Sequence, residues 1–175
     1  LRGRHMSATG EFQDGIIQKY KDQLDVFAKG LITETNNVYA KSSLPTLNSD
    51  ELNLKPTQSL MNYDNYVRHG SFDVVVYNNQ GQEVARKTIN INGSTSMDNR
   101  ASGNSIVDDF NSDTDDNGDK NSLNDVDDYF KAYYHYDPES GKGVFGVTPK
   151  KPSGGYSVAF VDKGSNFPGV IGVNR

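Results

Sequence analysis

An acidic stretch in the second half of the chain carries the residue types that bind calcium. Residues 113–124 read "DTDDNGDKNSLN". A helix–loop–helix calcium site takes oxygen ligands from loop positions 1, 3, 5, 7, 9 and 12, with glycine at position 6 for a sharp turn. Gly118 stands at that turn position. The candidate ligands at the first five of these positions are Asp113, Asp115, Asn117, Asp119 and Asn121.

The last ligand position of this loop argues against calcium. A bidentate glutamate belongs at position 12, but the sequence has Asn124 there, and an amide cannot supply two anionic oxygens. The stretch also fits a helix start, because Ser122 followed three residues later by Asp125 resembles a capping box. Aspartates favour the positive end of a helix. The sequence therefore favours a capped turn, with calcium as the alternative and no other cofactor indicated.

Composition and charge exclude several classes of function. The 175 residues include no cysteine, which rules out disulfides, thiolate catalysis and cysteine-ligated zinc. A net charge of −5 argues against nucleic acid and against an anionic membrane surface as partners. His69 and His135 lack the spacing of a zinc motif, and no nucleophile elbow or phosphate loop occurs. We therefore predict no catalytic residue and no enzymatic activity.

A long amphipathic pattern precedes this region. Over residues 14–43 the stripe positions recur at intervals of three or four, which is typical of one stripe along a helix. Because the rest of the segment is polar, we expect the stripe to need a partner helix, with packing on its own domain as the alternative. The stripe consists of Ile17, Tyr20, Leu24, Phe27, Leu31, Thr35 and Val38.

The remaining sequence changes to shorter elements. Residues 46–70 contain two prolines and no sustained period, which predicts a loop. Alternation over residues 72–91 around the turn "NNQG" predicts a β-hairpin. Two short helices are expected at residues 96–110 and 123–136. Further strands are expected at residues 143–147, 156–161 and 170–173.

Three stretches resemble a known family. Residues 20–40, "YKDQLDVFAKGLITETNNVYA", resemble the helix of flagellar axial proteins, where a Leu-Asp pair, an alanine one turn later and an Asn-x-hydrophobic ending recur. Residues 167–175, "FPGVIGVNR", look like the segment that closes the outer domain in the hook-associated protein 1 family, the hook–filament junction proteins. Residues 71–98 are similar to an outer-domain hairpin of its ε-proteobacterial members, with Ser96-Met97-Asp98 as the helix start that follows.

The resemblance implies a non-enzymatic, self-assembling subunit outside the cell, exported through the flagellar type III channel. It implies other copies and neighbouring hook and hook-associated subunits as partners, with no nucleic acid and no membrane. In this family, helices near the chain ends pack into an inner tube wall and β-rich domains project outward. A hook protein fragment and an extracellular calcium-binding or adhesive module are the alternatives. The residues that we expect to mediate assembly are Tyr20, Leu24, Phe27, Leu31 and Val38.

These expectations divide the chain into four parts. Residues 1–10 are a tag and linker, because "LRGRHM" looks like a vector remnant and the natural sequence is expected to begin near Ser7. Residues 11–45 form the helical segment of the inner domain, residues 46–70 a connecting loop, and residues 71–175 the outer domain. The predicted fold class is α+β: a long N-terminal helix followed by an antiparallel β-rich outer domain with two short helices.

Overall fold

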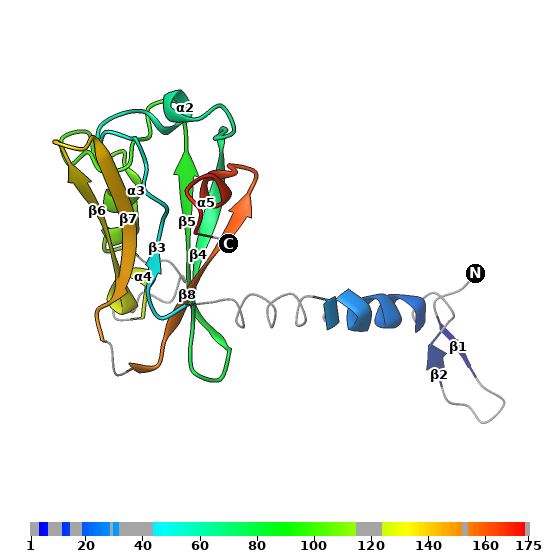
Figure 1. Cartoon of the computed structure of the whole chain (residues 1–175). Coiled ribbons are helices and arrows are strands. Elements are labelled where there is room, and N and C mark those ends of the chain that lie inside the picture. Colours follow the sequence, from blue (N-terminus) through cyan, green and yellow to red (C-terminus); the bar gives the residue numbers. More distant parts are fainter. Residues whose placement is uncertain are drawn as a thin grey trace. The chain divides into compact units, whose positions relative to one another are not determined.

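The structure is a computed structural model of the chain, and it describes residues 4–6, 12–14, 19–28, 30–31, 44–114, 124–151 and 154–173. The chain forms two compact units, Leu1–Tyr39 and Ala40–Arg175. Figure 1 shows the elements of both units along the chain. Each unit is described by itself below.

The first unit contains a hairpin and a short stretch of helix. Strands β1 (Arg4–Met6) and β2 (Phe12–Asp14) pair antiparallel. Residues 19–28 and 30–31 are helical. The expectation of a long N-terminal helix over residues 14–43 is wrong, because Asp14 belongs to β2 and pairs with Arg4. A stripe of apolar residues indicates which face of a helix is apolar, but it does not fix where the helix begins. Residues 32–43 lie outside the described residues.

The second unit is built on two antiparallel sheets. One has the strand order β5–β4–β8, with β5 at Glu83–Ile91, β4 at Gly70–Tyr77 and β8 at Ser157–Lys163. The other has the order β3–β7–β6, with β3 at Leu47–Asn48, β7 at Lys142–Pro149 and β6 at Phe130–Asp137. Figure 1 shows β6 and β7 on one side of this unit and β4, β5 and β8 on the other.

The hydrophobic core of this unit draws residues from both sheets. Phe160 on β8 is at its centre, with ring centroids 5.4 Å from Phe72 on β4 and 6.1 Å from Phe145 on β7. Phe110, on the helix α3 (Ile106–Asn111), lies 6.5 Å from the same ring. All four phenylalanines are buried. Each three-stranded sheet buries its apolar face against the other, which is the usual condition for the stability of small sheets.

The predicted hairpin is confirmed, and the second predicted helix is wrong. Strands β4 and β5 pair from Gly70↔Ile91 to Tyr77↔Glu83, with an irregularity between Val76 and Tyr77. Residues 123–136 were expected to be helical, but the described helix α4 covers only Val126–Tyr129 and strand β6 follows at once. In β6 the buried Phe130, Ala132 and Tyr134 alternate with exposed neighbours. That alternation is the period of a strand.

Two other expected elements are also corrected. The helix predicted at residues 96–110 is limited to α3, because the segment before it forms bridges from Ser96 to Ser59 and to Ser105. The strand predicted at residues 170–173 is instead the end of helix α5 (Phe167–Val170) and a turn. Pro168 in the first turn of α5 suits a helix start, because its missing N–H has no partner there.

Residues 46–70, expected to be a connecting loop, pack with Leu44 and Pro45 into the second unit. Strand β3 pairs with β7, and Leu44 exchanges backbone hydrogen bonds with Val158 of 3.1 and 2.9 Å. Helix α2 (Leu60–Tyr63) lies in the same segment. The division in the structure therefore falls at Ala40 and not at residue 71. The buried residues of this segment are Leu47, Leu52, Leu54, Leu60 and Val67.

A pair of truncations tests this boundary. We expect a chain of residues 40–175 to unfold cooperatively on heating, as followed by circular dichroism. A chain of residues 71–175 should show no cooperative transition, because it lacks the buried apolar side chains of residues 44–70, each of which contributes about 1.5–3 kcal/mol. A cooperative transition of equal midpoint in both chains would contradict this account of the core.

Candidate functional site

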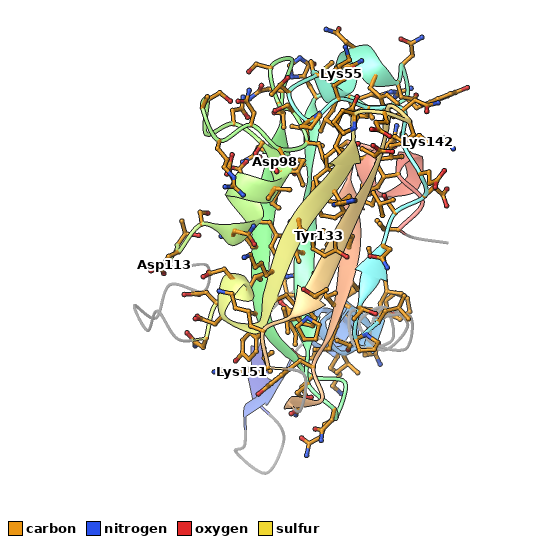
Figure 2. The ribbon with its side chains drawn as sticks, turned by 60° about the vertical axis from the view of Figure 1, so that its left-hand side comes forward. Lys55, Asp98, Asp113, Tyr133, Lys142 and Lys151 are labelled. Carbon is orange, nitrogen blue, oxygen red and sulfur yellow. The ribbon has the colours of Figure 1, made fainter. Side chains whose placement is uncertain are left out.

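The acidic stretch begins where helix α3 ends. Ser105 caps the start of α3, since its Oγ accepts a hydrogen bond of 3.2 Å from the Asp108 N–H and donates one of 2.7 Å to the Asp108 carboxylate. At the other end, the Ser112 hydroxyl donates to the Asp109 carbonyl at 2.7 Å. These contacts fix the point from which the chain continues to Asp113. Figure 2 shows Asp113 at the outer side of this part of the unit.

The acidic stretch is followed by helix α4, which has a capping box of its own. Asp125 is the N-cap residue, and its N–H donates a hydrogen bond of 3.1 Å to the Asp128 carboxylate. The sequence pattern assigned the cap to Ser122 with Asp125 as its partner. Ser122 lies outside the described residues, and the cap of α4 is one turn later. The predicted and the observed caps have the same physical basis, because carboxylates accept hydrogen bonds from the unpaired N–H groups in the first turn of a helix.

A buried lysine lies between the two short helices. Lys87 on β5 is only 7% exposed, and its ammonium donates a hydrogen bond of 2.6 Å to the Ser112 carbonyl. Burial raises the pKa of the Asp109 and Asp127 carboxyls, and the positive charge of Lys87 partly opposes that rise. Asp127 is also 4.0 Å from the Lys150 ammonium. An ammonium group therefore sits among carboxylates at the base of the acidic stretch.

Of the five candidate calcium ligands, Asp113 is described. Asp115, Asn117, Asp119 and Asn121 lie outside the described residues. Among the residues that the structure describes, no group of three or more acidic, histidine or cysteine side chains is arranged to hold a metal ion. The calcium prediction therefore stays a prediction. At the described start of the acidic stretch, the cation beside the carboxylates is the ammonium of Lys87.

A second buried charge lies on strand β4. The Asp73 side chain is fully buried and accepts three hydrogen bonds: 2.6 Å from Arg86, 2.7 Å from Lys163 and 2.8 Å from the Thr88 hydroxyl. Burial alone would raise the pKa of Asp73, but these three donors lower it below its usual value. The donors come from β5 and β8, so this carboxylate ties together all three strands of its sheet. Arg86 also binds Glu83.

The sequence contained a signal for both buried charges, Lys87 and Asp73, although neither was predicted to be buried. Lys87 stands in the inward register of β5, between the buried Ala85 and Ile89. Asp73 interrupts a run of buried apolar residues on β4. A charged residue at an inward position of a strand is seldom found without a partner.

Strand β6 carries both a buried and an exposed tyrosine. Tyr134 is buried, and its hydroxyl donates a hydrogen bond of 2.7 Å to the Leu54 carbonyl. Burial raises its pKa to about 12. Tyr133 is the exposed tyrosine; it lies in the middle of the β6–β7 face in Figure 2, and its hydroxyl donates to Asn48 at 3.2 Å. A Cβ on Gly146 would collide with the Tyr133 ring, so a larger residue at this position would displace that side chain.

The predicted assembly residues of the first unit are exposed where they are described. The exposed fractions are 63% for Tyr20, 65% for Leu24, 69% for Phe27 and 59% for Leu31. Val38 lies outside the described residues. Val26 is exposed as well, at 71%. Large apolar side chains at this spacing along one helix face form a surface that water solvates poorly.

Comparisons with known proteins do not place the chain in a family. No protein-family model matches it, and no curated protein sequence matches it significantly. In the described part of the chain, no helix is both long enough and apolar enough to cross a membrane.

The buried ammonium gives a prediction for stability and its pH dependence. We expect Lys87→Met to reduce the free energy of unfolding at neutral pH by about 2–3 kcal/mol, because a buried carbonyl and two partly buried carboxylates lose their cation. The lost charge raises the pKa of both carboxyls further. The loss should therefore be largest above those raised pKa values and shrink as the pH falls through them, because both carboxyls then become protonated in the folded state.

Urea unfolding at several pH values measures this effect, with Lys131→Met on the exposed side of β6 as the matched control. A loss of the same size at every pH would contradict the electrostatic explanation, since it would reflect packing alone.

The calcium prediction has a direct test on the whole chain. We expect the melting temperature to be the same in about 5 mM calcium chloride and in EDTA, because Asn124 replaces the bidentate ligand of a calcium loop. A bound ligand at a hundred times its dissociation constant would stabilise the fold by about 2.7 kcal/mol. A shift of several degrees that Asp113→Ala abolishes would overturn this expectation and establish the calcium site.

Proposed function

We propose that this chain is a structural, non-enzymatic subunit of the bacterial flagellum that joins hook to filament by self-assembly. Its partners are other copies of the chain and the neighbouring hook and hook-associated subunits, and its place is outside the cell. The proposal rests on one structural observation together with the sequence resemblance to flagellar axial proteins. The observation is the exposed apolar face of the first unit's helix.

The spacing of this face suits packing against other helices. Tyr20, Leu24 and Phe27 follow one another at intervals of four and three residues, and each is more than half exposed. Between them stand Lys21 and Asp25, which are polar and exposed. Burying a leucine or phenylalanine side chain contributes about 1.5–3 kcal/mol. In a tube of many subunits, each helix would bury such side chains against its neighbours.

The second unit supports a structural role through its packing. Its two sheets share one core, and its buried charges, Asp73 and Lys87, bind groups of the same unit. Their hydrogen bonds hold strands and the end of helix α3 in place. A rigid module of this kind suits a subunit that acts through its surfaces.

Substitution on the helix face tests the proposal in cells. We expect the full-length protein with Leu24→Ser and Phe27→Ser to give cells that do not swim in soft agar, because subunits can no longer bury this face. The matched control is Lys21→Ser with Asp22→Ser, on the polar side, which should leave swimming intact. Cells that swim normally with the apolar double variant would refute the assignment.

Electron microscopy of the same cells separates the two flagellar assignments. For a junction subunit, we expect cells with hooks but no filaments, and flagellin released into the medium. Cells that lack hooks altogether would instead identify the chain as part of the hook protein.

A further inference from the structure

The turn that follows strand β5 contains an asparagine–glycine pair. Asn92 and Gly93 come directly after Ile91, the last residue of β5, and both are exposed. The chain turns here, because the Thr95 N–H donates a hydrogen bond of 3.2 Å to the Asn92 carbonyl. The side-chain amide of an asparagine can be attacked by the backbone nitrogen of the next residue. Glycine hinders this attack least, because it has no side chain.

The side-chain carbonyl of Asn92 accepts three hydrogen bonds. Its Oδ1 accepts one of 2.9 Å from the Ser94 N–H, one of 2.8 Å from the Ser94 hydroxyl and one of 3.3 Å from the Asn104 amide. The Asn104 amide also donates to the Ser94 Oγ at 2.7 Å, which helps to hold that hydroxyl in place. Donors directed at a carbonyl oxygen stabilise the negative charge that develops there when the carbon is attacked. The folded turn therefore activates the Cγ atom of Asn92.

The nitrogen that would attack this carbon is accessible. No hydrogen bond from the Gly93 N–H is found in the part of the chain that the structure describes. The neighbouring groups are held: the Gly93 carbonyl accepts a hydrogen bond of 2.8 Å from the Ser59 hydroxyl, and the Asn92 N–H donates one of 3.0 Å to the Thr95 hydroxyl. The turn thus keeps its shape while one exposed N–H is able to lose its proton.

Glycine at position 93 is required neither by packing nor by the backbone. A Cβ built on Gly93 would meet no atom within 4 Å beyond its chain neighbours, and Gly93 is not among the glycines with positive φ. An alanine should therefore fit this position without strain. Because alanine would hinder the attack, the chemistry of the pair can be tested without disturbing the fold.

We propose that Asn92 is a site of spontaneous modification, at which a side-chain amide becomes a carboxylate. The Gly93 nitrogen loses its proton and forms a bond to Cγ of Asn92. The bond from Cγ to the amide nitrogen then breaks, and this nitrogen leaves as ammonia with the proton. Water opens the resulting five-membered cyclic imide at either carbonyl, which gives aspartate or isoaspartate. This site requires only water and goes beyond the assembly role proposed above, so either proposal can fail without the other.

The two products have different effects on the turn. Aspartate keeps the length of the backbone, and its carboxylate can accept from the same three donors as the amide oxygen. Isoaspartate adds one atom to the backbone between residues 92 and 93. The turn is tied to helix α2, because Ser59 binds the Gly93 carbonyl and the Leu60 N–H donates a hydrogen bond of 2.9 Å to the Thr95 carbonyl. Isoaspartate therefore displaces the groups that hold the start of α2.

Peptide mapping of the whole chain after incubation in neutral buffer tests the site. Trypsin releases residues 88–100 as one peptide, while the other asparagine–glycine pair of the chain, Asn117-Gly118, falls in the peptide 101–120. We expect tandem mass spectrometry to find both aspartate and isoaspartate at Asn92. Asn90 and Asn99, which are followed by isoleucine and arginine, should remain amides. An intact Asn92, or aspartate without isoaspartate, would overturn the proposal.

A synthetic peptide of residues 88–100 separates the contribution of the fold from that of the sequence. We expect Asn92 to be converted about two- to tenfold faster in the folded chain, the effect of one hydrogen bond, because the donors to Oδ1 are positioned only in the folded turn. Ser94→Ala should slow the folded chain and leave the peptide unchanged. A folded chain that reacts more slowly than the peptide would show that the fold protects Asn92, and would overturn the activation by Ser94 and Asn104.

Gly93→Ala is the matched variant for the attacking residue. We expect it to keep the melting temperature of the unchanged chain and to lose the conversion of Asn92 over the same incubation. Conversion at an unchanged rate would exclude attack by the nitrogen of residue 93. A lowered melting temperature would contradict the open space found at this position.

Discussion

The ring of Phe160 is the contact on which the second unit depends. It touches Phe72 within its own sheet, Phe145 in the opposite sheet and Phe110 on α3. Neither three-stranded sheet has enough buried area to be stable alone, and the short described helices are below the length at which a helix persists by itself. The core joins parts that are unstable separately, which explains why residues 44–70 have to belong to it. Their buried leucines belong to the same core as these phenylalanines.

Two buried charges then determine how the strands and helices are arranged around this core. Asp73 requires donors from β5 and β8 at once, and this favours a single register of the three strands. Lys87 requires the Ser112 carbonyl, so it holds the end of α3 against β5. Leaving either group buried without its partners is costly, whereas apolar contacts tolerate small shifts.

The sequence predicted the parts of the fold whose pattern is local. The β4–β5 hairpin, β7 and β8 have clear alternation or turn signals, and each appears near its expected place. The segment 123–136 was misassigned because Phe130 and Tyr133 also fit helical spacing, and only the opposite sheet shows that Phe130, Ala132 and Tyr134 face inward. The partners of Asp73 and Lys87 could not be predicted, because they depend on strand order and on where α3 ends. Periodicity carries no information about either.

The two units differ in where their large apolar side chains lie. The helix of the first unit presents Leu24 and Phe27, whose burial is favourable with any apolar partner of the right shape. In the second unit, by contrast, every described phenylalanine is buried, and the exposed large apolar residues are Leu44, Tyr66 and Tyr133. Because water solvates apolar surface poorly, the helix of the first unit is the described segment whose burial against a partner would contribute most.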